Sequence, residues 1–249
     1  MKEDEQEFGK NFQVQISLLL PAYNEEKRIA NTVTLAIRYF ESKGLTFEVV
    51  VIADGTDRTR DIVAEMASGD PRIRLLGGEE RRGKGYALRI GVRESRGRFI
   101  GFVDADNKTP IEQFSLFLPH LEAGIDIVMG TRRHPDARIE RWQPWFRRIG
   151  STVFGLFMHN IVGLKDIPDT QCGFKFFPRD VAKKLFSLSF VDGYIYDVEI
   201  LFLARKLGYR IVQIPIRWSD DGDSRLGLVF QNMQNFWDVV RIRLHRYPK

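Results

Sequence analysis

Residues 99–106 read Phe-Ile-Gly-Phe-Val-Asp-Ala-Asp, an apolar run that ends in two acids. If the run is a buried strand, residues i and i+2 share one face, so Asp104 and Asp106 emerge together at its carboxyl end. In an open α/β sheet, ligands bind at that end. Paired carboxylates need a cation or hydrogen bonds, and oxygen ligands suit Mg²⁺ or Mn²⁺. The pattern favours a metal that holds a diphosphate, and the alternative is a solvated turn.

Strand-like and helix-like segments alternate along the chain. In the first half, short apolar runs predict strands at 14–20, 47–53, 73–76 and 99–103, the first of them ended by Pro21. Amphipathic segments between them predict helices at 25–42, 57–67 and 85–95. The second half predicts strands at 125–129, 174–177 and 211–216, and helices at 180–186, 195–207 and 228–247. This order predicts an α/β fold with a mostly parallel central sheet flanked by helices.

Composition limits the function classes. The chain has 249 residues, a net charge of +5 and one cysteine, Cys172, so it forms no internal disulfide and suits a reducing compartment. Its acidic, polar start lacks the apolar core of a signal peptide, and no run approaches the roughly 20 apolar residues that span a bilayer. Six arginines lie between Arg132 and Arg148 against two acids. Such a cluster can serve phosphorylated substrates or anionic lipid, and the alternative is a solvated face.

Three further polar motifs lie where helices begin. Residues 21–25, Pro-Ala-Tyr-Asn-Glu, offer backbone N–H groups and an aromatic ring that can stack on a base, or simply a helix start capped by Asn24. Residues 54–57, Asp-Gly-Thr-Asp, form the same kind of turn. In residues 82–85, Arg-Gly-Lys-Gly, two glycines allow close backbone approach to a ligand while Lys84 meets phosphate. A flexible surface loop is the alternative for this last motif.

Taken in order, these motifs resemble the family-2 glycosyltransferases with the GT-A fold. Residues 169–177, Asp-Thr-Gln-Cys-Gly-Phe-Lys-Phe-Phe, narrow the resemblance to the dolichyl-phosphate glucose and mannose synthases, with the glucose branch nearer. Residues 196–199 and 224–226 add to it. The resemblance implies one GT-A catalytic domain over 13–249 after a flexible acidic tail at 1–12. It divides the domain into a nucleotide-binding half at about 13–107, an acceptor half at about 108–227 and an amphipathic helix at 228–247.

The resemblance implies an inverting transfer of one hexose from a nucleotide diphosphate to a polyprenyl phosphate. It assigns the nucleotide sugar to Pro21, Ala22, Tyr23, Glu25, Asp54, Lys84 and Asp104. Asp104 and Asp106 would hold Mg²⁺ or Mn²⁺, whose Lewis acidity suits a diphosphate leaving group, and Asp106 is assigned a catalytic role. UDP-glucose is the expected donor, with GDP-mannose second.

A lipid phosphate is already anionic, so it needs cations more than a general base. The resemblance assigns the acceptor phosphate to Arg132, Arg147, Arg148, Gln171, Lys175 and Arg225, with Arg132 also catalytic. Asp169 is assigned a site role, either as a base or in orienting the acceptor. Cys172 is expected to be packed rather than reactive. Asp197 and Glu199 lie two apart on a helix, and one of them is expected to pair with an arginine.

Two departures from the family bear on specificity. Ala53 stands where the family usually has a further acid, which puts the nucleobase in doubt. Lys108 stands where many mannose synthases have glutamine, which weakens the mannose interpretation.

The partners expected are a nucleotide sugar, a polyprenyl phosphate and the cytoplasmic face of a membrane, with no nucleic acid and with a homo-oligomer left open. Aromatic residues in 142–157 and the helix 228–247, beside arginines, suit an interfacial position, or else a core or dimer surface. The alternatives to this activity are a family-2 transferase acting on a soluble sugar or protein hydroxyl, and a catalytically lapsed membrane-surface scaffold. A membrane-surface or nucleic-acid binding module that uses the basic clusters is a further alternative.

Overall fold

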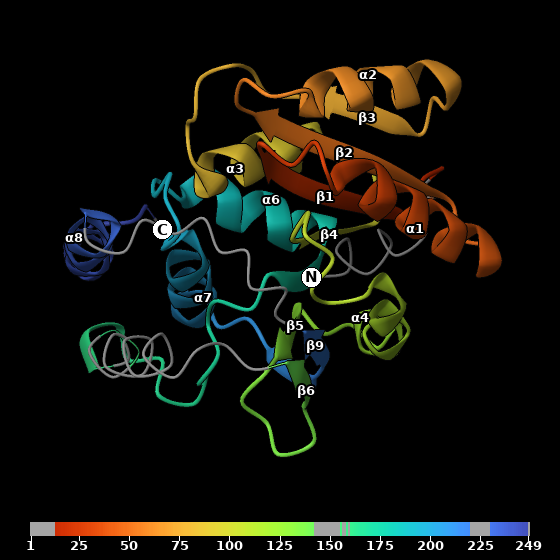
Figure 1. The fold of residues 1–249 in the computed structure, drawn as a ribbon. Helices are drawn as coiled ribbons and strands as arrows, with labels where there is room; N and C mark the ends of the chain where they lie inside the picture. Colours follow the sequence, from red (N-terminus) through yellow and green to blue (C-terminus); the bar gives the residue numbers. More distant parts are fainter. Residues whose placement is uncertain (1–12, 142–154, 156–157, 159, 220–229, 249) are drawn as a thin grey trace, which may run out of the picture.

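The computed structural model describes residues 13–141, 155, 158, 160–219 and 230–248. A seven-stranded sheet with the order β3-β2-β1-β4-β7-β5-β8 forms its centre (Figure 1). Its strands are β1 Ile16–Tyr23, β2 Phe47–Asp54, β3 Ile73–Leu76, β4 Phe99–Val103, β5 Ile127–Thr131, β7 Phe174–Pro178 and β8 Ile211–Pro215. A parallel two-stranded sheet pairs β6 Arg138–Arg141 with β9 Arg217–Ser219.

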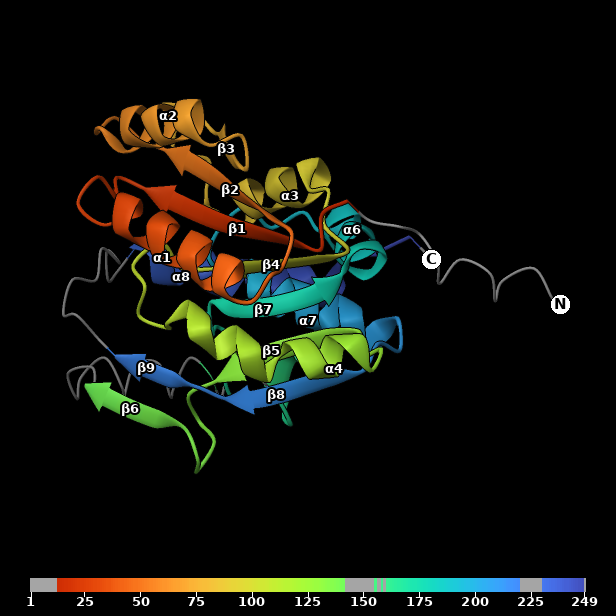
Figure 2. The same cartoon turned by 90° about the vertical axis from the view of Figure 1, so that its right-hand side faces the viewer.

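Helices cover both faces of the central sheet (Figure 2). They are α1 Ile29–Ser42, α2 Thr59–Gly69, α3 Lys84–Glu94, η2 Ile111–Leu116, α4 Leu118–Glu122, α6 Arg179–Leu188, α7 Tyr196–Lys206 and α8 Phe230–Leu244. Successive strand residues face opposite sides, so Leu19 packs with α3, α6 and α7, whereas Leu18 and Leu20 pack with α1 and η2. Two cores result, one on each face, as expected for a largely parallel sheet.

The predicted strands 73–76 and 99–103 match β3 and β4 residue for residue. The prediction that Pro21 ends the first strand is wrong, because β1 continues to Tyr23. Pairing with β4 stops at Leu19, whereas pairing with β2 runs to Tyr23, so Pro21 lies where β1 has a partner on one side only. A proline, which lacks an N–H, is tolerated at such an edge. The sequence analysis also missed η2, α4, β6 and β9.

One strand runs against its neighbours, and it shapes the site. β7 is antiparallel to both β4 and β5, with Val103 opposite Phe174 and Met129 opposite Lys175. The residues that precede β7 therefore lie at the same sheet edge as those that follow β4 and β5. This reversal brings residues 169–173 beside Asp104 and Arg132.

None of the helices within the described residues has both the length and the hydropathy needed to cross a membrane.

Candidate active site

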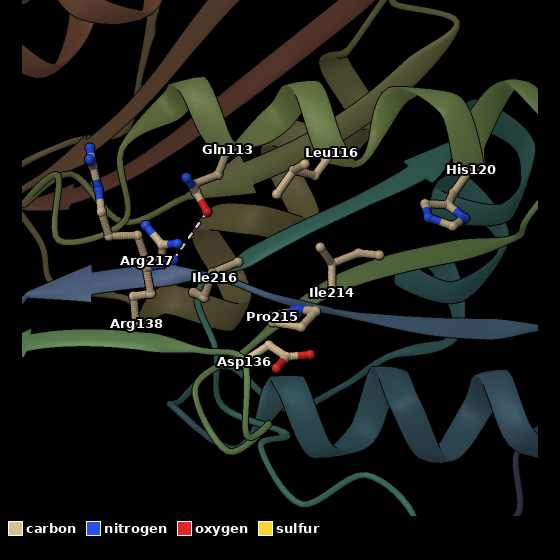
Figure 3. A pocket seen from close by; sticks show the side chains of 9 residues that line it. All are labelled: Gln113, Leu116, His120, Asp136, Arg138, Ile214, Pro215, Ile216 and Arg217. Carbon is tan, nitrogen blue, oxygen red and sulfur yellow. Dashed lines mark hydrogen bonds between the residues drawn. The ribbon is translucent and has the colours of Figure 1, made fainter.

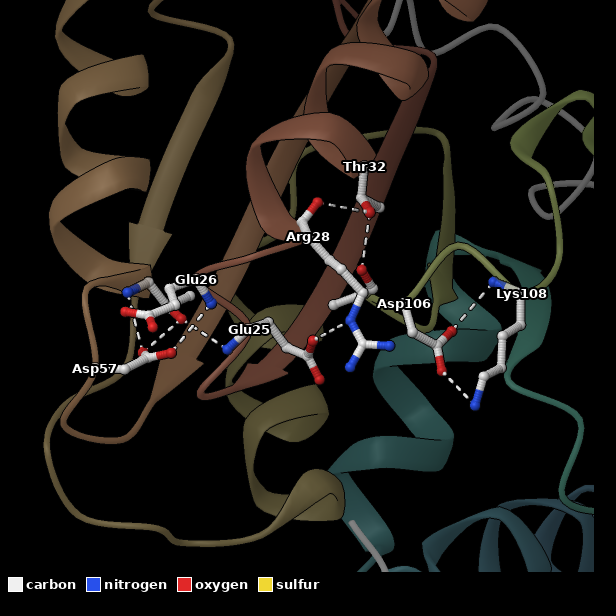
Figure 4. Close-up of polar contacts among 9 residues, drawn as sticks. Glu25, Glu26, Arg28, Thr32, Asp57, Asp106 and Lys108 are labelled. Carbon is white, nitrogen blue, oxygen red and sulfur yellow. Dashed lines mark hydrogen bonds and ion pairs between the residues drawn. The ribbon is translucent and has the colours of Figure 1, made fainter. Parts of the chain in front are cut away.

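The loops after β1 and β2 are tied together by side chains at the start of α1. Asn24 has a left-handed backbone (φ 54°), and its side-chain oxygen accepts hydrogen bonds from the backbone N–H of Thr56 at 3.1 Å and of Asp57 at 3.4 Å. The N–H of Glu25 donates to Thr59 Oγ1 at 2.8 Å (Figure 4). Residues 24–26 therefore serve this junction, and α1 begins only at Ile29 rather than at residue 25.

Asp54, the last residue of β2, is buried with one satisfied oxygen. Its Oδ2 accepts the Arg82 N–H at 3.1 Å, while its buried Oδ1 has no hydrogen-bond partner within the described part of the chain. The nearest cation, Arg82 Nη2, lies 3.6 Å from Oδ1. A buried acceptor without a donor is costly, and a ligand N–H would satisfy it. The predicted nucleotide role of Asp54 fits this geometry.

The neighbouring predicted contacts differ among themselves. The Tyr23 ring is half-buried, and the guanidinium of Arg81 lies 4.3 Å from its centroid, so that arginine already covers one ring face. Pro21 is half-buried at the end of β1. The side chain of Ala22 is buried in the core, so the nucleotide contact predicted for this residue would fall to its backbone. The carboxylate of Glu25 accepts a hydrogen bond from Arg28 Nε at 3.0 Å.

Asp104 and Asp106 lie on the loop after β4, as predicted, and each has a lysine partner. Asp104 forms an ion pair with Lys84. Figure 4 shows the second pair, in which Asp106 Oδ2 lies 3.3 Å from Lys108 Nζ. Burial and the nearby charge of Asp104 raise the pKa of Asp106, against the lowering effect of Lys108. Repulsion of this kind between carboxylates is relieved by a bound cation.

The acids fit a divalent metal that a diphosphate helps to hold. Their side chains remain 44% and 21% exposed. Mg²⁺ is commonly held by one or two carboxylates together with substrate phosphates and water. Within the described residues, no group of three or more His, Cys, Asp or Glu side chains is placed to hold a metal ion.

A buried threonine on α1 supports the acidic loop. Thr32 Oγ1 donates to the carbonyl oxygen of Ala105 at 2.8 Å and lies 3.2 Å from the carbonyl of Arg28 (Figure 4). Ala105 stands between the two acids, so this contact fixes the loop that carries both. The sequence analysis missed Thr32, although a threonine among the apolar residues on the buried face of α1 was the available signal.

The glycines of residues 82–85 pack against protein rather than ligand, which corrects their predicted role. A Cβ on Gly83 would lie 2.3 Å from the carbonyl oxygen of Asp192, and one on Gly85 would lie 2.2 Å from that of Val191. The N–H of Gly85 donates to the same Asp192 oxygen at 2.8 Å. These contacts seat the first turn of α3, and Lys84 points to Asp104.

Arg132 and Asp169 form a bidentate ion pair. Asp169 accepts hydrogen bonds from Arg132 Nε at 2.9 Å, from Nη2 at 2.7 Å and from the backbone N–H at 2.7 Å. Although burial acts to raise it, the Arg132 guanidinium holds the pKa of Asp169 below its ordinary value. Such an acid is a poor proton acceptor, so the geometry favours orientation of Arg132 over the base role. The Nη1 group of Arg132 is outside the pair, and the guanidinium lies over Trp218.

Lys175 is fully buried, and its predicted contact with the acceptor phosphate is wrong. Its ammonium donates to the carbonyl oxygens of Thr170 at 3.0 Å and Cys172 at 2.6 Å, and to the carboxylate of Asp197. A lysine has three donors, so none remains for a ligand. Of the two acids of which one was expected to pair with an arginine, Asp197 pairs with this lysine. Glu199 accepts hydrogen bonds from the backbone N–H groups of Phe190 and Val191 and from the Tyr247 hydroxyl.

The other predicted residues divide into three groups. Cys172 is packed, as expected. Its burial and the nearby Asp169 carboxylate raise the pKa of its thiol to about 12. Gln171 is exposed at the same sheet edge. Arg147, Arg148 and Arg225 lie outside the described residues.

A separate cavity of about 500 Å³ lies between η2, α4 and the strands β8 and β9 (Figure 3). Gln113, His120 and Arg217 are among its lining residues, and the backbone N–H of Arg217 donates to Gln113 Oε1 at 3.0 Å. None of the predicted site residues lines it.

Comparison with known proteins assigns the chain to a family. Residues 17–186, more than half of the chain, match glycosyl transferase family 2. The chain belongs to this family. The dolichyl-phosphate beta-glucosyltransferase of Dictyostelium discoideum is 33% identical over 243 residues, covering 92% of this chain and 74% of that protein. The Homo sapiens dolichyl-phosphate beta-glucosyltransferase is 31% identical over 249 residues, covering 92% of this chain and 75% of that protein.

Solved structures confirm the predicted GT-A fold of this glycosyltransferase. Mannosyl-3-phosphoglycerate synthase from Rubrobacter xylanophilus superposes with a TM-score of 0.66 at 18% identity, covering 94% of this chain and 77% of that one. Glucosyl-3-phosphoglycerate synthase from Mycobacterium tuberculosis, in complex with Mn²⁺, UDP and phosphoglyceric acid, superposes with a TM-score of 0.64 at 23% identity, covering 92% and 77%.

Proposed function

We propose that this glycosyltransferase transfers glucose from UDP-glucose to a polyprenyl phosphate such as dolichyl phosphate, with inversion at the anomeric carbon. The relatives at 31–33% identity over 92% of the chain are named for this reaction. The structural observation that carries the proposal is the Arg132–Asp169 pair, in which the candidate base is bonded to a guanidinium that keeps its Nη1 group outside the pair. That arrangement suits a nucleophile that is already an anion.

In the proposed reaction, an oxygen of the acceptor phosphate forms a bond to the anomeric carbon of the hexose. The bond from that carbon to the diphosphate oxygen breaks, and the nucleoside diphosphate leaves with the electron pair. Mg²⁺ or Mn²⁺ on Asp104 and Asp106 would supply Lewis acidity toward the departing diphosphate. Asp54 would accept from the nucleobase, and the Nη1 group of Arg132, which lies outside the pair with Asp169, would hold the acceptor phosphate.

We further propose that the enzyme contacts the cytoplasmic face of a membrane through α8. Trp237 and Leu244 are 67% and 74% exposed, and with Val240 they fall at i, i+3 and i+7 on one helical face. Arg241 and Arg243 flank that face, and each basic residue near an anionic bilayer contributes about 1 kcal/mol. The opposite face, with Val239 and Ile242, is buried in the core. An acceptor with a polyprenyl chain resides in such a membrane.

The test is incubation of the purified protein with polyprenyl phosphate and each of several sugar nucleotides, with Mn²⁺, Mg²⁺ or EDTA, followed by mass analysis of the lipid. We expect metal-dependent glucosyl lipid from UDP-glucose. A mannosyl lipid from GDP-mannose would correct the sugar. Nucleotide release without glycolipid would overturn the acceptor and point to a sugar or protein hydroxyl, and failure to bind any donor would support the lapsed scaffold.

A further inference from the structure

Lys84 lies beside Asp104 of the proposed metal site, on the side of the buried acid Asp197. Its ammonium forms an ion pair with Asp104 and lies 5.7 Å from the centroid of the Tyr196 ring. A lysine ammonium is charged at neutral pH, so Lys84 places a positive charge at one of the two acids that would bind the metal.

Packing fixes the backbone of Lys84. This residue is the first of α3, between two glycines at which an added Cβ would lie 2.3 Å from the carbonyl oxygen of Asp192 and 2.2 Å from that of Val191. The hydrogen bonds of Gly85 and Tyr86 to the Asp192 oxygen, at 2.8 and 3.3 Å, hold the same turn. The buried acid near Lys84, Asp197, is already paired with Lys175. The position of Lys84 thus follows from packing around it, and Asp104 is its principal partner.

A lysine on Asp104 opposes a divalent cation in two ways. It occupies carboxylate oxygen that the cation needs, and its charge repels a dication at short range, where the local dielectric is low. Asp106 is likewise paired with Lys108. A bare cation therefore meets two acids whose charges are already balanced. A cation that arrives with a diphosphate brings its own anion, to which an ammonium can transfer.

We propose that Lys84 competes with the divalent cation for Asp104, so that the cation binds tightly only together with the donor diphosphate, which takes over the ammonium. This inference rests on the proposed function, because it assumes the metal site at Asp104 and Asp106. Lys84 is then a positioning residue that couples metal binding to nucleotide binding. By linkage, UDP strengthens Mn²⁺ binding by the same factor as Mn²⁺ strengthens UDP binding.

The test measures Mn²⁺ affinity by electron paramagnetic resonance of free Mn²⁺, without nucleotide and with UDP, after allowance for Mn²⁺–UDP in solution. Lys84→Met should tighten Mn²⁺ binding without nucleotide by about tenfold or more and reduce the enhancement by UDP correspondingly. Lys84→Arg, which keeps the charge, should behave as wild type. Lys43→Met, which removes an exposed lysine beyond the end of α1, is the matched control.

The outcomes separate this inference from the proposed function. If Asp106→Asn leaves Mn²⁺ affinity unchanged, the metal site itself is wrong. If Asp106→Asn abolishes Mn²⁺ binding but Lys84→Met weakens it or leaves it unchanged, the competition is overturned and the site stands. Asp104 is partly exposed, so Lys84→Met strands no fully buried charge there. If Lys84→Met does not fold, the measurement on the wild type is the test. A wild-type Mn²⁺ affinity that is the same with and without UDP also overturns the competition.

Discussion

The acids after β4 and the acids around β7 are of the same residue type at the same edge of the sheet, yet their surroundings differ. Asp104 and Asp106 are partly exposed, and each is paired with a lysine ammonium. Asp169 and Asp197 are almost fully buried, and each is held by a cation with further hydrogen bonds. The first pair can exchange partners with a ligand, whereas the second is committed to the protein. We therefore expect substitutions after β4 to lower turnover and substitutions around β7 to lower stability.

The largest effect is expected at Lys175, because its loss leaves Asp197 charged and buried. Breaking a buried ion pair by removing one partner costs about 3–5 kcal/mol of unfolding free energy. Lys175→Met should lose that much in urea denaturation, and Lys175→Met with Asp197→Asn should recover a large part of it. If Lys175→Met kept the stability of wild type and lost only its affinity for the acceptor phosphate, the role first predicted for Lys175 would be correct.

Asp106→Asn tests the other side of the comparison. It removes a carboxylate charge from the proposed metal site, and loss of one group that stabilises developing charge costs about 10²–10³-fold in kcat. Its urea denaturation midpoint should match wild type. Asp61→Asn, at an exposed position on α2, is the control for loss of one acid. Undiminished turnover by Asp106→Asn would remove the metal role.

Asp169→Asn should lower kcat by about tenfold, which is less than the loss expected for Asp106→Asn, because Arg132 is then held less firmly. The folded-state pKa of Asp169 is lowered, so the stability that the ion pair contributes is present above its ordinary pKa near 4 and is lost as pH falls through the folded value. The difference in unfolding free energy between wild type and Asp169→Asn should thus be full at pH 7 and shrink in acid. If Asp169→Asn lost as much turnover as Asp106→Asn, and if none of the acceptors tested restored it, Asp169 would be an obligate base.

The smallest effect is expected at Thr32. Thr32→Val leaves the Ala105 carbonyl without its donor, a cost of about 1–3 kcal/mol for a buried group, and should weaken Mn²⁺ binding in the presence of UDP several-fold. Thr32→Ser, which keeps the hydroxyl, should restore it. Thr34→Val is the matched control, because Thr34 Oγ1 donates to the carbonyl of Ala30 within α1, at 2.8 Å, rather than to the acidic loop. Equal effects at the two positions would show that the loop contact does not matter.

The sequence predicted the region after β4 well because its information is local. A contiguous apolar run determines the strand, and the two acids follow it directly. The fate of Lys175 depended on the direction of β7 and on α7, which no local pattern encodes. The alternation of side chains along a strand nevertheless predicts that Lys175 is buried, since Phe174 and Phe176 face one core while Lys175 faces the other. A lysine in a strand covered on both faces requires a buried acid, and Asp197 was the available one.

The reversed strand β7 has a consequence for how such a chain can diversify. The segment 132–173 leaves the sheet after Thr131 on β5 and returns at Phe174 on β7, and those two strands are neighbours. The ends of this excursion are therefore held together by the sheet, whatever lies between them. Lengthening a closed loop adds only about 0.6 kcal/mol per doubling. Part of this segment packs into the core through Met158, Val162, Leu164 and Ile167. A replacement that keeps those residues, β6 and the Arg132–Asp169 pair would therefore leave the strands of the sheet in place, and under the proposed function it would change the acceptor preference.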